Sequence, residues 1–397
     1  MNSAVAYTTE LDDALEAAAQ LAAQIREKLE LKKHSAGILL CDADMDGAAV
    51  SAELAKLLGS DVLGMTTLAT LDADGHHEAA AVLTVLTADD CVFSASVSSS
   101  LPGADAQAAI TGAYRAGVPA ETAPGQRPGL LMAFCPYGLP FSGDLYPAVL
   151  SRAAGDAPVI GGVASDDYDY ERARVFLSGR SYNDAMVLLS LWGAVSPVFS
   201  IRHVTSRFAE RIRRITEAEG NIVRRVGDQT FVQYLEGFGL NTDVSDPLLA
   251  FTCYPMMLTC DTGDEETPLM RHICALNRED GSGAFFGDVP VGALANICLI
   301  NKDDLVRACR ESMSSLLEAA ALRPEYAPST ILCISCCGRA IILGANADGE
   351  GKALSEMLPP GISLAGAYCL GEICPTFYKD GKAVNRFHNC SITFCMF

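Results

Sequence analysis

Reactive and charged side chains stand at the ends of three expected strands in the last part of the chain, residues 329–397. One apolar strand runs into Cys336-Cys337-Gly338-Arg339, a second ends in Gly371-Glu372, and a third begins at Arg386-Phe387-His388-Asn389. Side chains at strand ends can converge on one pocket. The residues expected to bind a ligand there are Cys336, Arg339, Glu372, His388 and Asn389.

Arg339 supports two interpretations, which are compatible with each other. Gly338 frees the backbone after the strand, and Arg339 then lies at the start of a helix, where a carboxylate or phosphate would bind. Alternatively, Arg339 pairs with Glu372 and joins two strands. The site could recognise a zwitterion, with Arg339 holding the carboxylate and Glu372 the amine. The same residues could also do acid–base or nucleophilic chemistry, because a nearby Arg lowers the pKa of an exposed cysteine.

Two patterns resemble metal sites but fit other structures better. Asp42, Asp44, Asp46 and Glu53 have the spacing of a calcium loop, yet a buried strand precedes them where a helix is required. We expect Asp46 or Asp44 to cap the following helix instead. In Cys333-x-x-Cys336-Cys337, strand alternation separates Cys336 from the other two thiols. Core or pocket-lining thiols are predicted, with zinc and a redox dithiol as alternatives, and no cofactor or metal is expected.

Composition restricts the classes of protein and partner. The chain has 397 residues, of which 50% are hydrophobic and 20% charged, so it is globular and long enough for two domains. Its net charge of −20 disfavours nucleic-acid and membrane partners. The N-terminus lacks the features of a signal peptide, and the 15 cysteines are mostly in apolar strands. We therefore expect an acidic, cysteine-rich cytoplasmic protein with reduced thiols.

One structural unit recurs three times along the chain. A buried strand ends in Cys41, Cys135 or Cys336; a polar loop and a helix follow, and then comes a strand with Gly64, Gly161 or Gly366. Glycine inside a strand often marks the close approach of another backbone or a ligand. The pattern predicts three strand ends in similar roles, although units of this kind also arise by chance in proteins that mix helices and strands.

The whole chain from about residue 37 resembles the FIST family, with a FIST N-terminal domain followed by a FIST C-terminal domain. The N-terminal likeness rests on VLGMTTLATL and on VIGGVASDDY with the hairpin after it; the C-terminal likeness rests on SCCGR, GAYCLGE and RFHNCSITF. The expected division is an amphipathic helix over 1–35, a FIST N-terminal-like domain over 36–205 and a FIST C-terminal-like domain over 206–397. The resemblance implies a small-ligand-sensing domain of signal transduction, with amino acids among the ligands.

The prediction is an α+β protein of two domains, with mixed, largely antiparallel sheets flanked by helices and joined near Ser206. A ligand pocket is expected at the domain junction, since such junctions favour pockets. The residues expected to face the C-terminal group across the pocket are Thr66, Thr67, Gly161 and Gly162. Because the chain carries no fused output domain, the signal would pass to a separate partner. The alternative is a Cys- or acid/base-dependent hydrolase or transferase that uses the same pocket.

Overall fold

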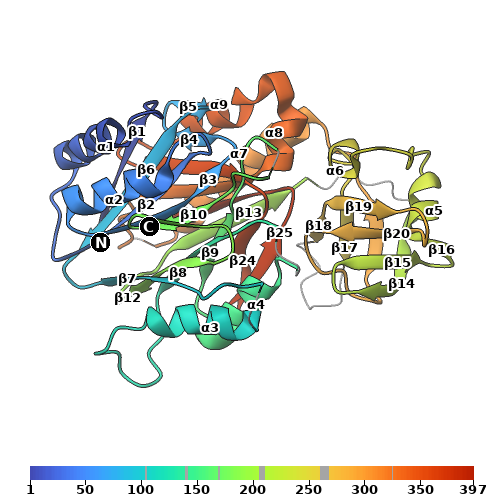
Figure 1. The fold of residues 1–397 in the computed structure, drawn as a ribbon, viewed down its shortest axis with the longest axis horizontal. Coiled ribbons are helices and arrows are strands. Elements are labelled where there is room, and N and C mark those ends of the chain that lie inside the picture. Colours follow the sequence, from blue (N-terminus) through green and yellow to red (C-terminus); the bar gives the residue numbers. More distant parts are fainter. Residues whose placement is uncertain (103–104, 139–141, 169, 205–210, 260–267, 324) are drawn as a thin grey trace.

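The computed structural model describes residues 1–102, 105–138, 142–168, 170–204, 211–259, 268–323 and 325–397. These residues form a large body of mixed sheets flanked by helices, with a smaller β-rich insert beside it (Figure 1). The predicted α+β class is confirmed. Among the described residues, no helix combines the length and the apolar character needed to cross a membrane.

The body consists of three units that share one order of elements: strand, helix, strand, helical segment and four strands. Unit 1 comprises β1 (Asn2–Thr8), α1 (Ala14–Lys28), β2 (His34–Asp42), α2 (Gly47–Leu58), β3 (Asp61–Thr67), β4 (Thr70–Asp72), β5 (Gly75–His77) and β6 (Ala81–Ala88). Unit 2 comprises β7 (Val92–Val97), α3 (Ala106–Ala116), β8 (Leu130–Cys135), α4 (Leu145–Ala153), β9 (Val159–Val163), β10 (Val175–Leu177), β11 (Arg180–Tyr182) and β12 (Val187–Trp192). Unit 3 comprises β13 (Val198–His203), α7 (Lys302–Ala321), β22 (Thr330–Cys336), α8 (Cys337–Leu343), the short η2 (Gly344–Asn346), α9 (Asp348–Met357), β23 (Ser363–Cys369), β24 (Glu372–Lys379), β25 (Lys382–His388) and β26 (Ser391–Met396).

The three sheets have the same order of strands, and the hairpin of each unit pairs with the sheet of another unit. The three sheets run β1-β6-β2-β3-β10-β11, β7-β12-β8-β9-β24-β25 and β13-β26-β22-β23-β4-β5. Thus hairpin β4–β5 of unit 1 joins the sheet of unit 3, β10–β11 of unit 2 joins unit 1, and β24–β25 of unit 3 joins unit 2. The exchange is cyclic, so the three units form one closed body with pseudo-threefold symmetry.

The repeated glycines explain why the parallel strands pack so closely. Gly64 pairs with Leu39, Gly161 with Ala133, and Gly366 with Cys333 of the preceding strand. A Cβ atom on these glycines would lie 1.7, 1.8 and 2.6 Å from the carbonyl oxygen of that partner, closer than real Cβ atoms come. The predicted repeat is therefore confirmed, and its glycines permit backbone contact between strands.

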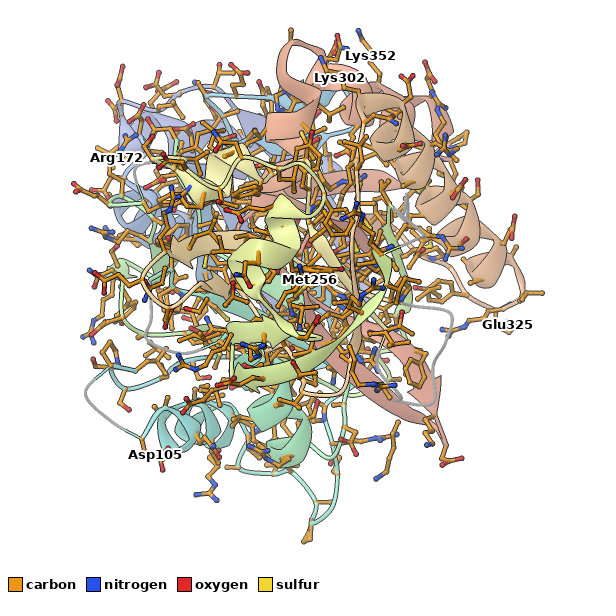
Figure 2. All side chains as sticks on the ribbon, turned by 90° about the vertical axis from the view of Figure 1, so that its right-hand side faces the viewer. Asp105, Arg172, Met256, Lys302, Glu325 and Lys352 are labelled. Carbon is orange, nitrogen blue, oxygen red and sulfur yellow. The ribbon has the colours of Figure 1, made fainter. Side chains whose placement is uncertain are left out.

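The insert (β14 to β21, residues 213–297) separates β13 from α7 of unit 3. It contains β14 (Arg213–Glu219), β15 (Ile222–Val226), β16 (Gln229–Thr230), α5 (Phe231–Glu236), α6 (Pro247–Ala250), β17 (Met256–Thr259), β18 (Leu269–Arg271), β19 (Ile273–Asn277), β20 (Ser282–Phe285) and β21 (Leu294–Ile297). Its sheet, in the order β18-β17-β21-β14-β15-β20-β19, packs around a core of its own that includes Phe231 and Phe285. In Figure 2, which looks onto this side of the molecule, Met256 of the insert lies in front of the body.

The predicted division of the chain differs from the sheets that form. The junction expected near Ser206 lies outside the described residues. Strands on either side of that point share sheets: β24 pairs with β9, and β23 pairs with β4. The expected N-terminal helix is confined to Ala14–Lys28, because residues 2–8 pair with β6 as an antiparallel strand. Their small and β-branched residues suit a strand covered on one face.

Candidate functional site

A cavity of about 600 Å³ lies between the body and the insert. Its walls come from the ends of β2 and β3, from the segments that follow β5 and β9, from α8 and η2, and from α6 of the insert. The lining residues are Asp42, Leu68, Ala69, His76, Glu78, Ala79, Asp167, Tyr168, Tyr170, Asp246, Leu248, Leu249, Ala340, Ile341, Gly344 and Ala347. The volume suits a small organic ligand, and most of the lining is apolar.

Segments that follow the glycine-bearing strands β3 and β9 line the cavity, with Leu68 after β3 and Asp167 after β9. Ser165, just after β9, holds these segments together. Its Oγ accepts a hydrogen bond from the Leu68 N–H at 3.0 Å and donates one to the Tyr368 carbonyl at 3.0 Å. Its own N–H donates to the carbonyl of Thr66 at 3.0 Å. One buried serine therefore joins β3, β9 and β23 beside the cavity.

A loop after β9 presents two tyrosines to the cavity. Tyr168 and Tyr170 have left-handed backbones, with φ of 79° and 61°. Asp166 holds this conformation, because one carboxylate oxygen accepts the N–H groups of both tyrosines at 3.1 and 3.0 Å. The other oxygen accepts the N–H of Arg172 at 3.0 Å. Burial raises the pKa of both phenols, so they remain neutral hydrogen-bonding groups.

A second cavity of about 300 Å³ lies beside the first and also touches the insert. Tyr137, which lines it, stacks on Tyr170 of the larger cavity with ring centroids 4.7 Å apart. The residues that line it are Pro136, Tyr137, Gly138, Gly143, Tyr146, Val163, Asn221, Cys274, Phe285, Phe286, Leu370 and Phe387. The stacked tyrosines thus stand between two cavities at the same junction.

Arg271 anchors the insert to the body. Its side chain is fully buried and donates to the Asp144 carboxylate at 2.8 Å and to the carbonyl of Phe387 at 3.1 Å. It also donates to the carbonyl of Asp288 at 3.0 Å. Because Asp144 and Phe387 belong to the body, this one guanidinium fixes the insert against units 2 and 3.

Comparison with known families identifies the chain. The model of the FIST N domain matches residues 35–229, and that of the FIST C domain matches residues 229–375. The chain belongs to the FIST family. FIST domains are sensory domains of signal transduction that bind small ligands.

Two solved structures of cyanuric acid hydrolases resemble the fold of this FIST protein only distantly. One has a TM-score of 0.31 at 10% identity, over 75% of this chain and 99% of that chain. The other, from A. caulinodans, has a TM-score of 0.38 at 9% identity, over 99% of this chain and 98% of that one. These scores carry no argument about activity. No curated protein matches the chain.

In this FIST protein, Arg339 forms a buried ion pair with Glu350, which was not predicted from the sequence. Its Nε donates to a carboxylate oxygen of Glu350 at 2.9 Å, and Nη2 forms a second contact with the same oxygen. Nη2 also donates to the Leu305 carbonyl at 3.0 Å. The expected pairing with Glu372 is wrong, because these contacts join Arg339 to α9 and α7. The guanidinium is fully buried and faces neither cavity.

Glu372 lies in a second buried polar group, next to Cys336. One of its oxygens accepts the N–H and O–H of Ser391 at 3.2 and 2.6 Å. Burial raises the pKa of Glu372 to about 8, against an ordinary value of 4.5. The carboxyl group is therefore mainly protonated at neutral pH. Burial likewise raises the pKa of Cys336 well above its usual value, which disfavours the thiolate.

His388 and Asn389 lie beside Glu372 and are buried as well. Glu372 pairs with His388 across β24 and β25 and with Gly162 across β24 and β9. The Nδ2 of Asn389 donates to the carbonyl of His388 at 2.9 Å, and burial lowers the pKa of His388, so its ring stays neutral. Among the described residues, Oε1 of Glu372, Nδ1 of His388 and Oδ1 of Asn389 have no hydrogen-bond partner.

The remaining predicted residues lie in β3 and β9. Thr66 donates to the carbonyl of Ser165 at 2.8 Å, and Thr67 donates to the carbonyl of Cys41 at 3.3 Å. Gly161 and Gly162 are in β9, and a Cβ atom on Gly162 would lie 2.6 Å from the sulfur of Cys369. None of the predicted site residues lines either cavity.

Two aspartates of the calcium-like pattern, Asp44 and Asp46, make other contacts in the structure. Asp46 caps α2 by accepting the N–H of Ala49 at 3.0 Å, which confirms the predicted cap. Asp44 forms an ion pair with Arg172. Within the described part of the chain, no group of three His, Cys, Asp or Glu side chains is arranged to hold a metal ion.

Sequence reasoning missed the residues that do line the junction. Tyr168 ends the VIGGVASDDY segment and Tyr170 follows it, and phenols directly after a strand end were a usable signal. Asp246 and Arg271 gave no such signal, because only the docking of the insert brings them to the body.

Proposed function

We propose that this FIST protein is a cytoplasmic small-molecule-sensing module of signal transduction, which binds its ligand in the larger junction cavity and acts through a separate partner protein. The observation that supports this most is the origin of the cavity walls. Asp246, Leu248 and Leu249 come from the insert, whereas Leu68 and Ile341 come from the body. A ligand that contacts both sides stabilises the arrangement in which they are docked.

The predicted polar residues then act as a support for the site. Ser165 joins the strand ends, Glu372 binds Ser391, and the ion pair of Arg339 with Glu350 fixes the helices that follow. These contacts hold the strand ends rigid, which keeps the cavity preformed. In this proposal the ligand is contacted instead by the side chains that line the cavity.

The proposal is tested by a thermal-shift screen of the full chain against amino acids, amines, small carboxylates and nucleotides. A ligand at 100 times its Kd adds about 2.7 kcal/mol to the free energy of unfolding. The variant Ala79→Phe places an aromatic ring in the cavity from an exposed position, and should abolish the shift. Ala73→Phe is the matched control, since Ala73 is exposed on the neighbouring turn and does not line the cavity. Equal shifts in both variants would contradict the assigned location.

A further inference from the structure

We infer that the larger junction cavity binds an amine: a molecule with a cationic amino group on an apolar or aromatic body and without a carboxylate. The inference rests on the proposed function and specifies its ligand class. It differs from the amino acid expected from the sequence, because the cation assigned to the ligand carboxylate, Arg339, is paired with Glu350 and faces neither cavity.

The charges of the cavity wall have one sign. Four lining residues are acidic, namely Asp42, Glu78, Asp167 and Asp246, and none of the described lining residues is Lys or Arg. Arg172 is the nearby cation, and it is shared between Asp44 and Asp167 in two ion pairs. Its charge is therefore balanced by these two carboxylates. A ligand carboxylate would meet like charges here, whereas an ammonium group would meet opposite ones.

Asp42 is an acidic group of the wall whose charged form is disfavoured by burial. It ends β2, and its Oδ1 accepts the N–H of Asp44 at 2.8 Å. The carboxyl group is half-buried, and burial raises its pKa. A cation placed close to a carboxylate in such surroundings restores the charged form. His76, on the same wall, does not compete with the ligand, because burial lowers the pKa of its ring and keeps it neutral.

The rest of the wall suits the apolar or aromatic part of such an amine. Asp166 fixes the backbone of Tyr168 and Tyr170, and the Tyr170 ring also stacks on Tyr137, so little ordering of this segment is needed on binding. Aromatic faces attract ammonium groups. The aliphatic lining includes Leu68, Leu248, Leu249 and Ile341, which provide apolar surface on both the body and the insert. The volume of about 600 Å³ accommodates a phenylethylamine or a diamine with water.

The test compares amino acids with the amines that differ from them by loss of the carboxyl group. The pairs are tyramine and tyrosine, phenethylamine and phenylalanine, isopentylamine and leucine, cadaverine and lysine, and agmatine and arginine. Binding to the full chain is measured by thermal shift and then by titration calorimetry. In at least one pair, the amine is expected to raise the melting temperature and to bind at least tenfold more tightly than its amino acid.

Charge-removing variants locate the amino group. Glu78→Gln and Asp42→Asn keep the shape of the wall, and each should weaken binding of the best amine about tenfold while leaving the melting temperature of the free protein almost unchanged. Glu27→Gln is the control, because Glu27 is an exposed residue of α1 that does not line the cavity. It should leave the affinity unchanged.

The outcomes separate the inference from the proposed function. If an amino acid binds as tightly as its amine, or if the charge-removing variants bind amines normally, the inference is overturned. If no amine binds, the inference is also overturned, and the broader screen with Ala79→Phe decides independently whether another ligand occupies the cavity. Amine binding that Ala79→Phe leaves intact would contradict both the inference and the proposed location.

Discussion

Arg339 and Glu350 form an ion pair in which both side chains are fully buried. Glu350 also accepts hydrogen bonds from Tyr368 at 2.8 Å and from Ser335 at 3.2 Å. The pair therefore connects α8 and α9 with β22 and β23. Buried ion pairs are often no better than apolar packing for stability, but losing one partner leaves an uncompensated charge in the interior.

Glu350→Gln should therefore destabilise the protein strongly, by about 3–5 kcal/mol, because Arg339 loses its counter-charge. Urea unfolding of the variant and the parent protein measures the difference. Glu356→Gln is the control, since Glu356 pairs with Arg310 on the surface, where a pair contributes about 0–1 kcal/mol. Equal effects at the two positions would show that the buried pair is not the one that fixes these helices.

Glu372 should make the stability of the protein fall as the pH rises. Below its ordinary pKa of 4.5 the group is protonated in both states, so it has no effect. Between 4.5 and about 8 the unfolded chain ionises while the folded chain keeps the proton, and the free energy of unfolding drops by about 1.4 kcal/mol per pH unit.

The comparison with Glu372→Gln isolates this effect. The difference in unfolding free energy between the parent protein and the variant should shift in favour of the variant from pH 5 to pH 8, and then level off. Unfolding in urea at a series of pH values measures it. A difference that stays constant over this range would mean that Glu372 is ionised in the folded protein.

Cys336 and Cys337 should react slowly with alkylating reagents. Burial raises the pKa of Cys337 to about 12 and that of Cys336 well above its usual value, and both are almost fully buried. Among the cysteines that the structure describes, iodoacetamide at pH 7.5 should first modify the partly exposed Cys253 and Cys274, and mass spectrometry of peptides locates the label. Rapid labelling of Cys336 in the folded protein would favour the alternative of a thiol-dependent enzyme.

The sequence was most informative where local chemistry determines structure. The buried strands, the cap at Asp46 and the three glycine-bearing strands all followed from residue types and spacing, because a strand glycine has a direct steric meaning. The exchange of hairpins between the units did not follow. It depends on which strand edges lie side by side after folding, and the residue types of β4 and β24 do not indicate which sheet these strands join.

In the candidate site, too, contacts that depend on tertiary packing could not be predicted from the sequence. Glu372 lies across paired strands from His388 and Gly162, but the interpretation that paired Arg339 with Glu372 is wrong. Glu350 lies in α9, and helix packing brings it to Arg339. The cavity itself depends on the insert, whose Asp246 reaches the body only through tertiary docking. Pairwise spacing in the sequence contains no information on that contact.

The most direct test of the central claim is hydrogen exchange with and without the compound that gives the largest thermal shift. Slower exchange is expected in residues 246–250 of the insert and in residues 340–347 of the body together, since both segments line one cavity. Helix α3 does not line it and should exchange at the same rate in both samples. Protection confined to a different face, with no change in these two segments, would contradict a ligand site at the junction.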